Sequence, residues 1–157
     1  MGTHAKAECT INAPIHAVWD VLTDFDNGKG WNEVYTVKTS DFNAGGKLTL
    51  KSIALNGAIR LNVKFYRVEK PGPMSQSAFM GWGNNTALSR FVLHANHYFD
   101  LRKIDDNTTL LIHGEIFNGL MGPLVKFGLD KVNEVYEGMN QSLKAYVESR
   151  VIEAEAS

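Results

Sequence analysis

The stretch Leu120–Val151, LMGPLVKFGLDKVNEVYEGMNQSLKAYVESRV, decides how the rest of the chain must fold. Its apolar residues recur at steps of three and four, the spacing of one face of an α-helix. At about 1.5 Å per residue, about thirty residues form a helix roughly 45 Å long. Gly128 and Gly138 weaken it, and we expect a bend at one of them. The apolar stripe comprises Leu124, Val125, Phe127, Leu129, Val132, Val135, Tyr136, Met139, Leu143, Tyr146 and Val147.

The segments before this helix read mainly as β-strands, so a large sheet must cover the stripe. The first strand is predicted at Ala5–Ile11, and a short helix follows from Asn12, with Pro14 in its first turn. Strands grouped apart from helices indicate the α+β class, and a curved sheet around one helix leaves room for a cavity. Alternation and turn residues predict further strands at Val34–Thr39, Lys47–Leu55, Ile59–Glu69, Met74–Trp82, Arg90–Lys103 and Thr108–Phe117, with loops at Asn56–Gly57 and Gly81–Asn85.

Composition excludes several classes of function. The 157 residues fit one domain, residues 1–157, and the net charge of −1 gives no overall basic excess that would attract nucleic acid. No apolar run reaches the length of a membrane span, so no stable membrane insertion is expected. Cys9 is the only cysteine, which rules out an internal disulfide and a cysteine-based metal cluster. We expect no metal and no cofactor, and the absence of a signal-peptide pattern favours the cytoplasm.

Several local sequences carry a resemblance to a known superfamily. They are Ile11–Pro14 with Val18–Trp19, Trp31–Asn32, His97–Leu101, His113–Leu120, and Met139–Asn140 with Leu143–Lys144. Together with the order of elements, they resemble the START-like (SRPBCC) superfamily and its polyketide cyclase/dehydrase type members. The resemblance implies a helix-grip fold: a curved seven-stranded antiparallel sheet around the C-terminal helix, two short helices after the first strand, and an apolar cavity. The superfamily includes lipid carriers, aromatic cyclases, hormone receptors and co-chaperone activators, so the resemblance specifies the fold more than the function.

Three polar residues are the candidate catalytic group. On Arg90–Lys103 the apolar face includes His97, and on Thr108–Phe117 one face carries His113 and Glu115. If the turn pairs residues whose numbers sum to about 210, His97 lies opposite His113 and Glu115 lies two residues along the same wall. A slip of one residue would turn the cluster away. A carboxylate beside an imidazole can hold one tautomer for proton transfer near neutral pH, as enolisation or dehydration requires. The alternative is a buried polar network that fixes strand pairing.

The aromatic and sulfur-containing side chains of the predicted interior are the candidate ligand contacts, because such groups suit a flat apolar molecule. Core packing is the alternative for each of them. Asn133 and Asn140 lie beside the helix stripe, and one of them could also bind a ligand. The candidates for ligand binding are Trp31, Met80, Trp82, Phe99, Phe117, Tyr136 and Met139.

Three hypotheses for function follow. The leading one is a monomer or homodimer that binds a small hydrophobic molecule, cyclic or aromatic and lipid- or polyketide-like, in an internal cavity. The second is a cyclase, dehydratase or isomerase that acts on a polyketide-like substrate through His97, His113 and Glu115. The third is a module that presents its sheet to a partner protein, with Tyr35, Tyr66 and Tyr98 facing outward.

Overall fold

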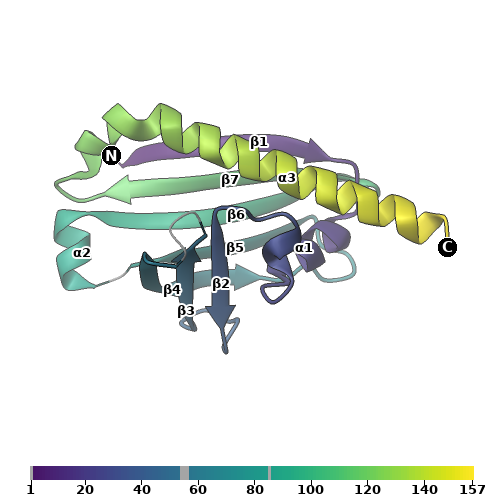
Figure 1. Ribbon diagram of the computed structural model, residues 1–157, viewed down its shortest axis with the longest axis horizontal. Coiled ribbons are helices and arrows are strands. Elements are labelled where there is room, and N and C mark those ends of the chain that lie inside the picture. Colours follow the sequence, from purple (N-terminus) through teal and green to yellow (C-terminus); the bar gives the residue numbers. More distant parts are fainter. Residues whose placement is uncertain (1, 54–56, 85) are drawn as a thin grey trace.

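Seven antiparallel strands form one curved sheet that lies against a long C-terminal helix (Figure 1). This computed structural model describes residues 2–53, 57–84 and 86–157. The sheet has the order β1-β7-β6-β5-β4-β3-β2, so only β1 and β7 are neighbours that are not consecutive in the chain. The predicted helix-grip architecture is confirmed. The strands are β1 Thr3–Ile11, β2 Tyr35–Thr39, β3 Lys47–Ser52, β4 Arg60–Glu69, β5 Ser77–Gly83, β6 His94–Asp105 and β7 Thr108–Asn118.

Two short helices follow β1, as expected. The helix α1, Ile15–Thr23, begins directly after Pro14, and the short 3-10 helix η1 spans Gly28–Gly30. The side chains of α1 that enter the core are spaced at helical period, and this helix packs against both the sheet and the C-terminal helix. These buried side chains are Ile15, Val18, Trp19 and Leu22.

The C-terminal helix begins later than the sequence predicts. Residues Gly122–Gly128 form the 3-10 helix η2, and the α-helix α3 spans Leu129–Glu155, so the chain changes from one helix to the other at Gly128. Within η2, Leu124 is 54% exposed and Phe127 is 92% exposed, although both belong to the predicted stripe. Residues three apart share a face of a 3-10 helix, so Leu124 and Phe127 lie together on the outward face of η2, while Val125 packs against the core. The residues of α3 that are buried are Tyr136, Met139, Asn140, Leu143 and Val147.

The segment before β6 is a helix where a strand is predicted. Ala87–Val92 form α2, and β6 starts only at His94. The Thr86 side chain accepts a hydrogen bond from the Ser89 backbone N–H, and the Ser89 hydroxyl accepts one from the Thr86 N–H. These reciprocal bonds satisfy two N–H groups at the start of the helix, which outweighs the apolar alternation around Arg90.

Two loops predicted from the sequence are Gly81–Asn85 and Asn56–Gly57. Gly81–Gly83 continue β5 instead of forming a loop, because they pair with Asn96–Tyr98 of β6, and Asn85 lies outside the described residues. Of the Asn56–Gly57 turn, Asn56 lies outside the described residues, while Gly57 has the positive φ of 76° that favours glycine.

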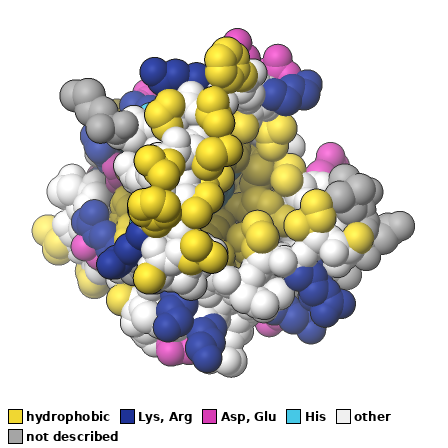
Figure 2. Space-filling model, turned by 90° about the vertical axis from the view of Figure 1, so that its left-hand side faces the viewer, with side chains coloured by type: hydrophobic (Ala, Val, Ile, Leu, Met, Phe, Trp, Pro, Cys, Tyr) yellow, Lys and Arg dark blue, Asp and Glu magenta, His cyan; other side chains and the backbone are white. Residues whose placement is uncertain are grey.

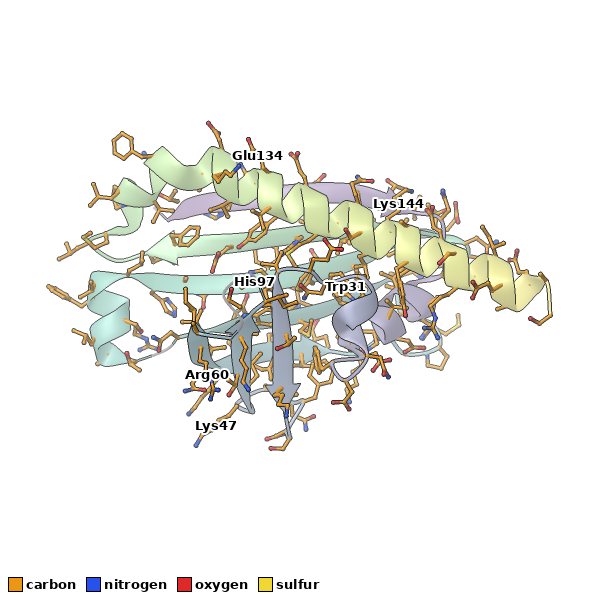
Figure 3. The ribbon with its side chains drawn as sticks, in the orientation of Figure 1. Trp31, Lys47, Arg60, His97, Glu134 and Lys144 are labelled. Carbon is orange, nitrogen blue, oxygen red and sulfur yellow. The ribbon has the colours of Figure 1, made fainter. Side chains whose placement is uncertain are left out.

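The pairing of β6 with β7 differs from the predicted register but keeps the same face. His97 lies opposite Glu115 and Phe99 opposite His113, so paired numbers sum to 212 instead of 210. An irregularity between Lys103 and Asp105 shifts the pairing by one further residue next to the turn, where Asp105 pairs with Thr108. Because the partner moves by two residues, each side chain stays on its own side of the sheet. Figure 3 shows His97 and Trp31 toward the middle of the molecule, with Lys47 and Arg60 at its edge.

Candidate functional site: an aromatic cavity beside a buried histidine chain

A chain of hydrogen bonds joins β6, β7 and α3 in the interior. The Tyr136 hydroxyl lies 2.5 Å from Glu115 Oε2 and 3.3 Å from His97 Nδ1. The Nε2 atoms of His97 and His113 are 3.0 Å apart, and His113 Nδ1 lies 3.1 Å from Asn140 Oδ1. The structure therefore brings the three predicted catalytic residues together, with both histidines almost completely buried.

Burial keeps both imidazoles neutral. It lowers the pKa of His113 to about 3, although the hydrogen bond with Asn140 acts in the opposite direction. Burial also holds the pKa of His97 well below its usual value, and the neighbouring His113 lowers it further. Burial raises the pKa of Glu115, while the hydrogen bond from Tyr136 partly offsets that effect. The result is a neutral histidine pair next to one carboxyl group that ionises less readily than usual.

The ionisation of Glu115 sets the direction of the whole chain, because a neutral imidazole carries one N–H. When Glu115 is ionised, the Tyr136 hydroxyl donates to it, so His97 Nδ1–H donates to Tyr136 and His113 Nε2–H donates to His97. The unprotonated His113 Nδ1 then needs a donor, which the Asn140 amide supplies when Nδ2 faces it. When Glu115 is protonated, each of these bonds reverses and His113 Nδ1–H donates to Asn140 Oδ1.

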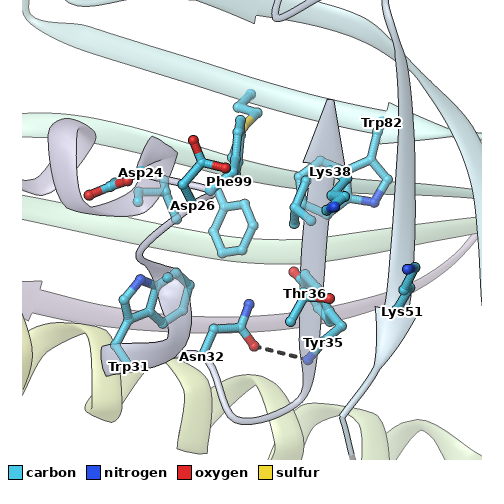
Figure 4. A pocket seen from close by; sticks show the side chains of 15 residues that line it. Asp24, Asp26, Trp31, Asn32, Tyr35, Thr36, Lys38, Lys51, Trp82 and Phe99 are labelled. Carbon is cyan, nitrogen blue, oxygen red and sulfur yellow. Dashed lines mark hydrogen bonds between the residues drawn. The ribbon is translucent and has the colours of Figure 1, made fainter. Parts of the chain in front are cut away.

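Beside this chain lies a cavity of about 340 Å³. Its walls come from the segment after α1, from β2 and from the inner faces of β5 and β6 (Figure 4). Five of its lining residues are aromatic, and the charged Asp24, Asp26, Lys38 and Lys51 also belong to its lining. The remaining lining residues are Leu22, Phe25, Gly28, Trp31, Asn32, Tyr35, Thr36, Val37, Met80, Trp82 and Phe99.

Two residues of the cavity lining each carry a buried polar atom without a satisfied hydrogen bond. The Trp31 Nε1 atom and the Tyr35 hydroxyl find no partner among the residues that the structure describes. Asn32 holds the turn between them, because its Oδ1 accepts hydrogen bonds from the backbone N–H groups of Val34 at 3.0 Å and Tyr35 at 3.1 Å (Figure 4). Buried donors are normally paired, so these two groups lack a partner that most buried polar groups have. Burial raises the pKa of Tyr35 and Glu115 raises it further, which places the Tyr35 hydroxyl on the side of the histidine chain.

One layer of aromatic rings separates the cavity from the histidine chain. The Trp82 ring stacks on His97 with centroids 4.6 Å apart, and the Phe99 ring stacks on His113 at 4.2 Å. Trp82 and Phe99 line the cavity with their other surfaces. Tyr35 also packs edge-on against His97, with centroids 6.3 Å apart. The hydrogen-bonded histidines therefore pack against the side of the Trp82 and Phe99 rings that faces away from the cavity.

The predicted ligand contacts divide into two groups. Trp31, Met80, Trp82 and Phe99 line the cavity. The lining that the described residues form leaves out the other three: Tyr136 belongs to the hydrogen-bond chain, and Phe117 and Met139 are packed in the core.

Sequence reasoning missed two residues of the site. It named Tyr35 as a partner contact if that residue lay on an outward face, but the Tyr35 hydroxyl is buried and the residue lines the cavity. It treated Asn140 as a residue beside the stripe, yet Asn140 is 1% exposed and binds His113. The step of four from Tyr136 to Asn140 puts both on one helical face, which was the available signal for Asn140.

No three His, Cys, Asp or Glu side chains within residues 2–53, 57–84 and 86–157 are grouped so that they could hold a metal ion. In the same ranges, no helix combines the length and the apolar character that crossing a bilayer requires.

Comparison with models of known protein families assigns the chain to one of them. The family model described as "Polyketide cyclase / dehydrase and lipid transport" matches residues 3–148. The chain belongs to this family. A search of curated proteins finds no match. Membership and fold together point to hydrophobic ligand binding or a polyketide cyclase-like function, with no particular substrate specified.

Solved structures share the fold at low sequence identity. A hypothetical protein from Helicobacter pylori has a TM-score of 0.71 at 11% identity, covering 92% of this chain and 88% of that one. The ZhuI aromatase/cyclase from Streptomyces sp. R1128 has a TM-score of 0.64 at 14% identity, covering 96% of both chains. A START superfamily protein from Mycobacterium smegmatis has a TM-score of 0.63 at 17% identity, covering 93% of this chain and 97% of that one.

Proposed function

We propose that this protein binds a small, flat, apolar molecule that carries a hydrogen-bond acceptor. The observation that carries the proposal is the 340 Å³ cavity, whose lining includes Trp31 and Tyr35, each with a buried polar atom that has no hydrogen-bond partner among the described residues. A cavity of this size falls in the range that holds drug-sized ligands.

The chemistry of the walls defines the ligand class. The faces of Trp82 and Phe99 favour a ring system that stacks on them, because offset and edge-on contacts between rings are favourable. A carbonyl or phenol oxygen on that ring would accept a hydrogen bond from Trp31 and one from Tyr35. An aromatic or polyketide-like ring with an oxygen substituent meets both requirements, whereas a plain alkyl chain leaves both groups unpaired.

The test is a titration with 1-anilinonaphthalene-8-sulfonate, a flat aromatic probe with acceptor oxygens. We expect saturable binding near one equivalent, with quenching of tryptophan emission because Trp31 and Trp82 line the cavity. Trp31→Phe and Tyr35→Phe keep the rings but remove the polar groups. Each should weaken binding about two- to tenfold, as expected for the loss of one hydrogen bond.

The matched control is Phe127→Ser, because Phe127 is 92% exposed and lies outside the cavity lining. The probe also adheres to exposed apolar surface, so this variant separates surface binding from cavity binding. If Phe127→Ser abolishes the saturable signal while Trp31→Phe and Tyr35→Phe leave it unchanged, the cavity is not the binding site.

The second candidate is a cyclase or dehydratase, favoured by the continuous hydrogen-bond chain from Glu115 to His113. A dehydratase would take the α-proton of a β-hydroxy ketone at an imidazole nitrogen and return a proton to the departing hydroxyl group, releasing water. This role requires His97 to reach the ligand past Trp82. Enone formation from a β-hydroxy ketone, followed by ultraviolet absorbance, should then depend on His97, and His97→Gln should abolish turnover while probe binding persists. A wild-type protein that binds the probe but forms no enone would leave binding as the function.

A further inference from the structure

One end of the molecule carries a large exposed apolar surface, which we call the apolar end. Backbone hydrogen bonds join its two main segments: the N–H of Leu120 donates to Phe91 O at 3.1 Å, and that of Met121 donates to Val92 O at 2.9 Å. Figure 2 looks onto this end and shows hydrophobic side chains gathered around a hollow. The exposed side chains, with their exposed fractions, are Leu88 73%, Phe91 66%, Val92 41%, Leu93 38%, Leu120 68%, Met121 43%, Leu124 54% and Phe127 92%.

The start of β4 lies at the same end of the sheet. Lys64 pairs with Gly83, the last residue of β5, so the residues of β4 before Lys64 extend beyond the end of β5. The chain enters α2 shortly after Gly83, so these residues lie at the same end of the sheet as α2. Ile59 and Leu61 are 50% and 54% exposed there. Exposed apolar surface on this scale, contributed by three separate segments, marks an interaction site.

The charged residues within the three segments that carry the apolar end all have one sign. Across the segments 57–64, 86–93 and 119–128 the sequence has four charged residues and no Asp or Glu: Arg60, Lys64, Arg90 and Lys126. The net charge of −1 for the whole chain conceals this local excess. Bulky apolar groups interspersed with basic ones are the pattern of proteins that lie on an anionic lipid surface, where the apolar groups enter the acyl boundary and the cations pair with headgroups.

We propose that the apolar end docks on the surface of an anionic phospholipid bilayer. A second copy of this chain fits less well, because a two-fold interface would bring the same basic residues face to face. The shape agrees, since Phe127 projects almost fully into solvent and can insert without any rearrangement of the core. The proposal does not depend on the ligand of the cavity.

Vesicle flotation tests the proposal, with vesicles of phosphatidylcholine alone or of phosphatidylcholine mixed with phosphatidylglycerol. The wild-type protein should float with the mixed vesicles, and less so as salt rises from about 0.1 M to about 1 M and the Debye length falls from about 10 to 3 Å. Phe127→Ser and Phe91→Ser should each weaken partition roughly tenfold, the loss expected for one inserted aromatic side chain. Lys126→Glu should weaken partition onto the mixed vesicles only.

The control is Met74→Ser. Met74 is 88% exposed but precedes Ser77, which pairs with Arg102 at the opposite end of β6 from α2, so this substitution should leave partition unchanged. Failure of the wild type to float, an equal loss in Met74→Ser, or equal flotation with both kinds of vesicle would overturn the proposal. So would a solution dimer that Phe127→Ser converts to monomers, since a second copy would then cover this surface. All variants change exposed residues, and probe binding in the cavity reports on their folding separately.

Discussion

Acidification should destabilise this protein through His97 and His113. Both are buried and neutral in the fold, and the pKa of each lies below the value of about 6.5 for an exposed histidine. The unfolded chain therefore binds protons that the native state does not, once the pH falls below about 6.5. Their stabilising contribution is complete above that pH and is lost as the pH falls toward the folded-state pKa, which is about 3 for His113.

The magnitude follows from linkage. When the pH falls from about 7.5 to about 5, each histidine that stays neutral in the native state lowers the free energy of unfolding by about 2 kcal/mol. The pair therefore lowers it by about 4 kcal/mol. This is a large share of the roughly 5–15 kcal/mol by which a domain is stable. Glu115 acts in the opposite direction, because burial raises its pKa and the native state then binds a proton more readily than the unfolded chain does.

Urea unfolding at several pH values measures this effect, provided that the slope of free energy against urea stays constant. The variant His113→Gln removes one of the two histidines, so its loss of unfolding free energy over the same pH range should be smaller than that of the wild type by about 2 kcal/mol. Glu115 is present in both proteins, and its contribution largely cancels in the comparison. If wild type and variant lose the same free energy of unfolding on acidification, the native state does not hold His113 neutral. The buried hydrogen-bond chain would then not have the protonation states given above.

Further predictions concern the hydrogen-bond chain, the turn before η2 and the cavity. Tyr136→Phe should lower the free energy of unfolding by about 1–3 kcal/mol because it leaves buried polar partners unpaired. It should also raise the pKa of Glu115, because the hydrogen bond from Tyr136 lowers that pKa. Titration of the Glu115 carboxyl group by NMR measures this change. Gly119→Ala should destabilise by about 1–3 kcal/mol in thermal unfolding, because Gly119 has φ +91° and an added Cβ would lie 2.8 Å from a backbone oxygen. Gly138→Ala, in the middle of α3 with nothing within 4 Å, should instead stabilise by about 0.5–1 kcal/mol. Bound ligand should raise the melting temperature less in Trp31→Phe than in the wild type, since one donor to the ligand is lost.

The elements that the sequence predicted best were those in which a repeating pattern coincides with burial. The first strand, ending at Ile11, and the helical face at Tyr136, Met139 and Leu143 follow the expected periods, because each faces one continuous core. The pattern failed at Phe127 and around Arg90. Phe127 lies on the outward face of the 3-10 helix η2, and around Arg90 local capping by Thr86 decides the structure.

The sequence by itself determined the class of fold and the face on which His97, His113 and Glu115 lie, because side-chain alternation is a local property of a strand and survives a register shift of two residues. Only the tertiary structure decided that Tyr136 and Asn140 complete the hydrogen-bond chain, and that Trp82 and Phe99 separate this chain from the cavity. The physical reason is that these contacts join β5, β6, β7 and α3, whose mutual distances depend on the curvature of the whole sheet. No local pattern encodes that curvature.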